Sequence, residues 1–342
     1  MYNVQIVVNN NLCISCGICM AVCPQKCITM SKHDGLYTPS ICSQCTKCGY
    51  CFDICPGKGK IRDSDEKLKY EELIGKYNNI YNGWSKDEII RHYSASGGVV
   101  TTIIHELLKS NSYDVAFVVR DFSYNHYVET CSVRAEDADG IIDFTNDESF
   151  TAKSRYIPIG HGKAVDYILK NPMQKVIIIG TSCAIRGFLN VIQQRKLKRD
   201  NYLLIGLFCE SVMNYLVWDY FMQKKFTKGN TIAALHFKNK ESGGWPGNIK
   251  MVFTDGSHRY YDSSYRIEVK PYLKPKRCLY CIDKLNVKAD ISLGDNYTGE
   301  NDSALGSNTV IIRTEFGETA WKNCINKIEF KEVSEVKVIK AQ

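Results

Sequence analysis

The sequence predicts an α/β (α+β) protein in two parts, a small cysteine-rich N-terminal domain and a larger mixed α/β domain. Three observations lead to this prediction. Ten of the sixteen cysteines lie between Cys13 and Cys55. From residue 93 to about 230, short apolar strands alternate with amphipathic helices, which favours a largely parallel sheet. Beyond residue 230 the pattern becomes strand-rich.

We divide the chain into four segments where the composition changes. Residues 1–57 hold too few large apolar side chains for an ordinary core, and residues 58–92 read as a charged, weakly helical connector. Residues 93–230 form the α/β region, and residues 231–342 form the strand-rich C-terminal region.

The spacing of apolar residues predicts the elements after residue 93. Helices are expected over 99–110, 161–171, 184–196 and 214–226. Continuous apolar runs predict buried strands over 114–122, 175–180 and 201–209. Further on, Thr254-Asp255-Gly256 joins two apolar runs and indicates a hairpin.

A cysteine motif occurs twice in the N-terminal domain. Cys13-x2-Cys16-x2-Cys19-x3-Cys23-Pro recurs as Cys45-x2-Cys48-x2-Cys51-x3-Cys55-Pro. This is the run of bacterial two-cluster ferredoxins, in which the fourth cysteine of each run ligates the other 4Fe-4S cluster. We therefore expect one cluster on Cys13, Cys16, Cys19 and Cys55, and a second on Cys45, Cys48, Cys51 and Cys23. Zinc is the alternative, since C-x2-C pairs also bind zinc.

Eight cysteines lie outside these runs. Cys183 and Cys209 follow predicted strands, at the edge where open α/β sheets bind ligands. Cys278 and Cys281 form another C-x2-C pair. Their spacing alone leaves two interpretations open, metal ligands or small buried side chains. We expect no ligand role for the other four, which are Cys27, Cys42, Cys131 and Cys324.

A run of small residues precedes the predicted helix at 99–110. Ser94-Ala95-Ser96-Gly97-Gly98 would leave backbone N–H groups exposed at the positive end of the helix dipole, which suits a diphosphate. The run matches neither common nucleotide-binding glycine motif. A plain helix cap therefore remains the alternative.

Charge and hydropathy limit the compartment and the partners. Lys plus Arg exceed Asp plus Glu by seven, but three thiolate-bound clusters would remove about six of these charges. A nucleic-acid partner is therefore not expected. No apolar run approaches the roughly 20 residues of a membrane span, and the N-terminus lacks the basic and apolar regions of a secretory signal. We expect a cytoplasmic protein.

Five segments together resemble the family of coenzyme F-420 hydrogenase/dehydrogenase beta subunits, which is related to 7-hydroxymethyl chlorophyll a reductase. They are SASGGVVT at 94–101, AKSRYIPIG at 152–160, GTSCAIRGF at 180–188, GLFCE at 206–210 and RCLYCIDKLNVKADISLGD at 277–295. The resemblance spans about residues 1–300 and includes the ferredoxin-like domain that many members carry. In one departure, Ser182 replaces the proline of the family's GTPC motif.

The resemblance implies specific ligands. It implies a third 4Fe-4S cluster held by Cys183, Cys209, Cys278 and Cys281. It also implies FAD in the α/β region, contacted by Ser96, Gly97, Gly98, Thr101, Lys153, Ser154, Tyr156, Thr181, Asp295 and Asn296. No catalytic acid or base can be named.

These expectations define a leading function and its alternatives. The leading hypothesis is an oxidoreductase that moves electrons between 4Fe-4S clusters and FAD, with hydride exchange to a deazaflavin such as coenzyme F-420 or to another small organic substrate. Its expected partner is a ferredoxin or another redox protein or subunit, and a homo-oligomer remains open. The alternatives are a non-catalytic electron-relay subunit and a reductase of a glycan-pathway or other organic substrate. A zinc-ribbon nucleic-acid binder is the remaining one.

Overall fold

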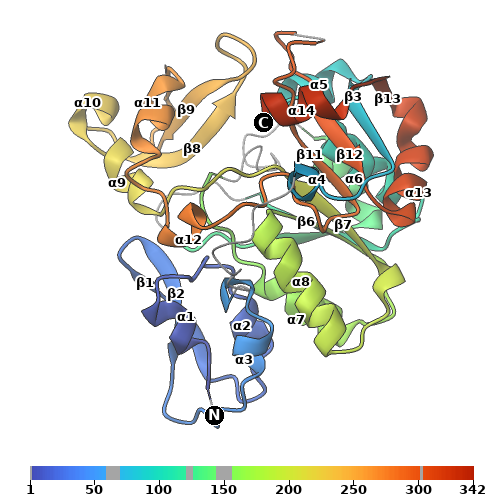
Figure 1. The fold of residues 1–342 in the computed structure, drawn as a ribbon. Helices are drawn as coiled ribbons and strands as arrows, with labels where there is room; N and C mark the ends of the chain where they lie inside the picture. Colours follow the sequence, from blue (N-terminus) through green and yellow to red (C-terminus); the bar gives the residue numbers. More distant parts are fainter. Residues whose placement is uncertain (1, 59–69, 121–125, 144–155, 301–302) are drawn as a thin grey trace.

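The computed structural model describes residues 2–58, 70–120, 126–143, 156–300 and 303–342. Its N-terminal part, which we call the ferredoxin module, lies beside the larger body of the protein (Figure 1). The module contains α1 (Gln5–Asn9), α2 (Ile18–Ala21), β1 (Ile28–His33), β2 (Leu36–Ile41), α3 (Tyr50–Asp53) and the 3-10 turn η1 (Pro56–Lys58). β1 and β2 pair as an antiparallel hairpin.

The two cysteine runs fold into equivalent loops. Ser15 and Lys47, at matching positions of the two runs, have positive φ angles of 57° and 54°. Gly17 and Gly49 are also left-handed, at 66° and 86°, and directly precede α2 and α3. Glycine adopts this conformation without the steric cost that a Cβ atom brings. The sequence repeat is therefore a structural repeat.

Cysteines make up most of the buried core of the module. This core comprises Val4, Val7, Cys19, Cys23, Cys27, Ile28, Cys51 and Cys55. Three of its eight members are ordinary aliphatic residues, which agrees with the small number of large apolar side chains in this part of the sequence. A core of this kind depends on what its thiols bind.

The larger body is built on an eight-stranded sheet with the order β13-β3-β12-β11-β7-β6-β4-β5. Its strands are β3 (Asn79–Ser85), β4 (Val115–Val118), β5 (Cys131–Arg134), β6 (Val176–Gly180), β7 (Tyr202–Leu207), β11 (Ile291–Asp295), β12 (Asn308–Ile312) and β13 (Ile328–Glu332). β4, β6, β7 and β11 pair in parallel, and the other four pairings are antiparallel. The mixed α/β class is confirmed, whereas the expectation of a largely parallel sheet is wrong.

Helices cover both faces of this sheet (Figure 1). Successive residues of a strand point to opposite faces. Ile177 and Ile179 of β6 pack in one apolar cluster with the helices α6 (Val99–Lys109) and α13 (Glu315–Cys324). Val176 and Ile178 pack in another with α7 (Gly162–Lys170) and α8 (Ser182–Gln194). Ile18 of the ferredoxin module belongs to this second cluster, so the module packs on the α7–α8 layer.

The segment expected to be a connector contributes to the sheet. The expectation over 58–92 is wrong for β3, because this strand pairs with β12 on one side and β13 on the other. Its polar Asn82 is buried, accepts a hydrogen bond from the Thr309 hydroxyl at 3.2 Å and donates one to Thr298 at 3.0 Å. Tertiary partners thus allow a polar segment to lie inside a sheet.

A separate three-stranded sheet follows residue 230, with β8 (Ile232–Asn239), β9 (Asn248–Phe253) and β10 (His258–Tyr261). The predicted hairpin is confirmed, since β9 and β10 pair antiparallel across it. The helix expected over 214–226 is instead two shorter helices, α9 (Leu216–Phe221) and α10 (Lys224–Thr227). The break at extended Gln223 lets Phe221 and Phe226 pack together, with ring centroids 5.1 Å apart.

Short elements complete the chain. They are α4 (Tyr70–Ile74), α5 (Glu88–Tyr93), η2 (Ala135–Ile141), η4 (Arg199–Asn201), α11 (Ser264–Val269), α12 (Lys276–Leu279), η5 (Ile325–Lys327) and α14 (Glu335–Ala341). In the part of the chain that the structure describes, no helix has the length and apolar character needed to cross a membrane.

Candidate metal centres and cofactor cavity

The eight cysteines of the repeated motif gather into two groups. After burial itself, the neighbours that raise the pKa of Cys16 are Cys55, Cys19 and Cys13. The pKa of Cys51 is likewise raised by burial and then by Cys23, Cys45 and Cys48. Each group therefore combines three thiols of one run with the fourth thiol of the other, the arrangement that the motif predicts.

The two groups differ in exposure. Cys16, Cys19 and Cys55 of the first group are buried, whereas Cys48 of the second group is exposed. Backbone N–H groups point at sulfur in both groups, from Ser15 to Cys13 at 3.4 Å and from Lys47 to Cys45 at 3.4 Å. Such contacts stabilise thiolate ligands and adjust cluster potentials. The second group is thus the outer one.

Four other cysteines line one small cavity, which we call the third site: Cys183, Cys209, Cys278 and Cys281. Cys183 lies in the first turn of α8, directly after β6, and Cys209 lies two residues after β7. Cys278 is in α12, and Cys281 follows it. Burial raises the pKa of Cys183 to about 11, and the thiols of Cys278 and Cys281 contribute to this rise. Four thiols around one cavity are the donor set of a 4Fe-4S cluster.

Buried polar side chains hold the third site together. Asp283 accepts a hydrogen bond from Arg186 of α8 at 3.0 Å, and its carbonyl accepts one from the Ser182 hydroxyl. Asn286 donates to the carbonyls of Gly180 at 3.0 Å and Leu207 at 3.3 Å, at the ends of β6 and β7. The segment with Cys278 and Cys281 is therefore fixed to the helix and strands that carry Cys183 and Cys209. Ser182, which departs from the family motif, contributes one of these bonds.

The third site also contacts the ferredoxin module. Cys16 and Ile14 line the same cavity as its four thiols. The backbone N–H of His161, another lining residue, donates to the carbonyl of Cys16 at 2.8 Å. Among the described residues, no three His, Cys, Asp or Glu side chains form a group for a single metal ion. The thiols instead surround a space that adjoins the inner group of the module.

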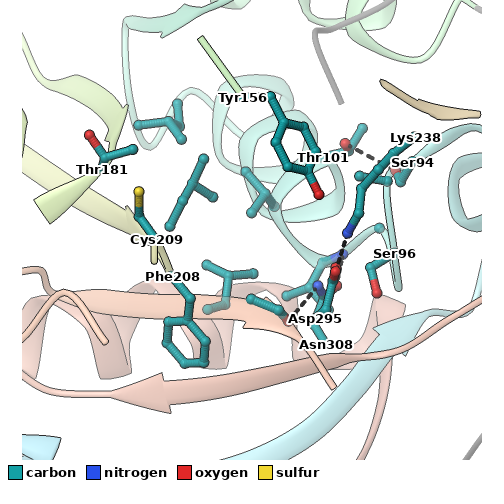
Figure 2. Close-up of a pocket in the computed structure, with 18 of the residues that line it drawn as sticks. Ser94, Ser96, Thr101, Tyr156, Thr181, Phe208, Cys209, Lys238, Asp295 and Asn308 are labelled. Carbon is teal, nitrogen blue, oxygen red and sulfur yellow. Dashed lines mark hydrogen bonds and ion pairs between the residues drawn. The ribbon is translucent and has the colours of Figure 1, made fainter. Parts of the chain in front are cut away.

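A larger cavity of about 300 Å³ lies at the carboxyl ends of the parallel strands. Residues at or just beyond the ends of β4, β6, β7 and β11 line it, as do Lys238 of β8 and the loop before α6. Figure 2 shows Thr181 and Cys209 on one side, and Lys238, Asp295 and Ser96 on the other. Its apolar walls include Ile104, Ile179, Leu207 and Leu293. We call it the cofactor cavity.

The N-terminus of α6 opens into the cofactor cavity. Gly98 is its N-cap residue, with a φ of 81°, and no described side chain caps the helix. First-turn N–H groups at a helix N-terminus favour anions. The preceding loop is held from behind, because the Ser96 hydroxyl donates to the Ser307 carbonyl at 2.6 Å and Lys240 Nζ donates to the Ser96 carbonyl at 2.9 Å. The cavity thus contains a rigid seat for a phosphate.

The structure brings most of the implied FAD contacts together. The cofactor cavity is lined by Ser96, Gly98, Thr101, Tyr156, Thr181 and Asp295. Gly97 packs behind the loop, and buried Asn296 hydrogen-bonds to Glu300 and Ser307 within its own loop. Lys153 and Ser154 lie outside the described residues. The sequence reasoning missed other lining residues, among them Lys238, Asn308, Phe208, Glu210, Lys270 and Lys284.

Three lysines line the cofactor cavity. Lys238 is 6% exposed and forms an ion pair with Asp295, which also accepts a hydrogen bond from Tyr297 at 3.0 Å. Lys270 pairs with Glu210 at 2.8 Å, and this bond lowers the pKa of Glu210. Lys284 has no ion pair in the described part of the chain, and burial lowers its pKa. It is the cavity cation left to face an anionic group.

Gly97→Ala is expected to disturb the phosphate seat. A Cβ atom at this position would lie 2.8 Å from both Asn308 Oδ1 and the Gly83 carbonyl oxygen. Because a backbone atom must shift, we expect a loss of about 1–3 kcal/mol in unfolding free energy and weaker flavin retention. Urea unfolding and flavin quantification measure both. Gly140→Ala, whose Cβ atom would lie 3.6 Å from its nearest neighbour, is the matched control. Equal behaviour of the two variants would contradict this role of Gly97.

The third site and the cofactor cavity share a wall. Thr181, Cys209, Glu210 and Ser211 line both. These residues come directly after β6 and β7, which are adjacent parallel strands. The four-thiol site is therefore next to the cavity on one side and next to the ferredoxin module on the other.

Comparisons with known proteins agree with this architecture. Two family models describe the beta subunit of coenzyme F420 hydrogenase/dehydrogenase; residues 80–165 match the N-terminal model, and residues 173–336 match the C-terminal one. Residues 6–29 match the model "4Fe-4S binding domain". The fold and its sites thus define an iron–sulfur redox protein. The chain belongs to the family of coenzyme F-420 hydrogenase/dehydrogenase beta subunits.

Individual relatives are distant. The chain is 25% identical to the F-type subunit of the F(420)H(2) dehydrogenase of Methanosarcina mazei, covering 95% of this chain and 86% of that protein. It is also 25% identical to the "Coenzyme F420-dependent sulfite reductase" of Methanocaldococcus jannaschii, of which it spans only 47%. A chain of the F420-reducing [NiFe] hydrogenase complex from Methanosarcina barkeri shares the fold, with a TM-score of 0.56 and 16% identity over 78% of this chain and 86% of that one.

Proposed function

We propose that this chain is an FAD-dependent iron–sulfur oxidoreductase that moves electrons between its ferredoxin module and an organic hydride carrier. The observation that supports it most is contiguity. Cys16 lines the third site, and Cys209 lines both the third site and the cofactor cavity. A redox partner would meet the exposed second group first, and the buried first group would lead inward to the third site.

The cofactor cavity fits FAD. When bound, FAD exchanges a hydride with an organic molecule and single electrons with iron–sulfur clusters. The first turn of α6 would hold the diphosphate, while Ile104, Ile179 and Leu207 exclude water from the cavity. Lys284, near Cys209 and without a carboxylate partner in the described chain, would stabilise negative charge at the end next to the third site.

We further propose a deazaflavin such as coenzyme F-420 as the organic hydride carrier. The family and the printed names of the relatives support this substrate class. The names of two relatives also refer to a subunit and to a complex, which supports a redox protein or subunit as the electron partner. Flavin reoxidation by coenzyme F-420, compared with other organic acceptors, tests the choice. Reoxidation only by the other acceptors would contradict it.

The anaerobically purified protein is expected to contain about twelve iron atoms and one FAD per chain, because three four-iron clusters use all twelve proposed ligands. Iron, sulfide and flavin quantification with an absorption spectrum measures this content. Zinc in place of iron would contradict the whole proposal. About eight iron atoms would remove the third cluster only.

A further inference from the structure

Cys27 was expected to have no ligand role, but the structure places it against the second group of the ferredoxin module. Its Sγ lies 3.6 Å from Sγ of Cys23, and both side chains are buried. Cys27 is also a hydrogen-bond neighbour of the Cys45 thiol. The second group therefore contains a fifth thiol, which touches one ligand from each of the two runs.

The backbone around Cys27 is held in place. The N–H of Lys26 donates to the carbonyl of Cys23 at 3.2 Å, and Lys26 has a left-handed φ of 52°. The carbonyl of Cys27 accepts a hydrogen bond from Cys42 at 3.0 Å, where the β1–β2 hairpin begins and ends. This tight turn returns the chain toward the cluster position that Cys23 serves. A rotation of the Cys27 side chain would then suffice to exchange one sulfur for the other.

The first group offers a natural comparison. Cys23 in the first run corresponds to Cys55 in the second, and four residues later the chain has Cys27 in one case and Gly59 in the other. The turn that supplies a fifth thiol to the second group thus has no cysteine at the matching position for the first. The repeat is symmetric in its eight motif cysteines and asymmetric in this residue.

We propose that Cys27 is a reserve ligand of the second cluster, able to take the iron that Cys23 otherwise holds. In the exchange, the Cys27 sulfur–iron bond forms and the Cys23 sulfur–iron bond breaks. The proton that Cys27 loses is taken up by the Cys23 thiolate, so no electron is transferred. This inference rests on the proposed function only in requiring a 4Fe-4S cluster in the second group.

Alanine variants test the proposal, because alanine cannot bind iron. The wild type must first show the iron and the reduced-cluster electron paramagnetic resonance signals of the ferredoxin module; their absence would overturn the proposed function instead. Cys23→Ala is then expected to keep the wild-type iron content and to show no three-iron signal after oxidation. Cys55→Ala is expected to lose one to four iron atoms and to show that signal or a missing cluster.

The variants at Cys27 complete the design. Cys27→Ala alone is expected to keep the full iron content, while the Cys23→Ala/Cys27→Ala double variant behaves as Cys55→Ala does. A shifted midpoint potential of the second cluster in Cys23→Ala would further support a change of ligand. The proposal is overturned if Cys23→Ala loses iron as Cys55→Ala does, or if Cys27→Ala alone loses a cluster.

Discussion

Cys281→Ala is expected to lower the iron content from about twelve to about eight atoms per chain and to slow electron transfer from the ferredoxin module to the flavin at least a hundredfold. Cys281 lines the third site but not the cofactor cavity. Flavin binding should therefore survive, so that loss of the third cluster is separated from loss of FAD. Stopped-flow reduction of the flavin, with clusters reduced by a one-electron donor, measures the rate.

Two further variants support the interpretation of Cys281→Ala. Cys183→Ala should show the same loss of iron, because Cys183 lines the same cavity from α8. Cys131→Ala is the control, since Cys131 lies on the edge strand β5 and lines neither cavity. Unchanged iron in Cys281→Ala and Cys183→Ala would show that these thiols bind no cluster.

Asp290→Ala is expected to lower the unfolding free energy by about 3–5 kcal/mol, because it leaves a charge of a buried ion pair without its partner. Asp290 is fully buried and accepts two hydrogen bonds from Arg199, at 2.7 and 2.8 Å. It also accepts bonds from the Leu204 backbone N–H at 2.8 Å and the Thr314 hydroxyl at 2.7 Å. These contacts join β7 to the start of β11, two strands that line the cofactor cavity.

Urea unfolding measures the effect of Asp290→Ala. The control is Asp200→Ala, since Asp200 is exposed beside Arg199 and a surface change of this kind stays within about 0.5 kcal/mol. A loss below about 1 kcal/mol in Asp290→Ala would place this ion pair in the weak class of solvated pairs.

The sequence predicted elements well where local pattern decides the structure. Strong apolar spacing located α6, α7 and α8 to within two residues at each end. β3 was missed because its Asn79 and Asn82 look unfavourable for a strand, while its partners β12 and β13 lie far along the chain. Only the folded state supplies the hydrogen bonds that make Asn82 acceptable there.

The same distinction applies to the sites. Motif spacing gave the grouping of the repeated cysteines, and the strand-end rule led to Thr181, Cys209 and Asp295. Lys238 and Asn308 reach the cofactor cavity from β8 and β12, without a motif of their own. Cys27 was set aside because it stands outside the motif, whereas a turn of the folded chain returns it to Cys23.

The pairing of β3 has a consequence for the order of folding. β3 is synthesised early, but its hydrogen-bond partners Asn308–Ile312 and Ile328–Glu332 follow on the order of two hundred residues later. The cysteines of the ferredoxin module all lie within residues 13–55, so their contacts are local and can form while the rest of the chain is still emerging. We therefore expect the two module clusters to be loaded first, and the third site to become complete only after residue 281 has been added.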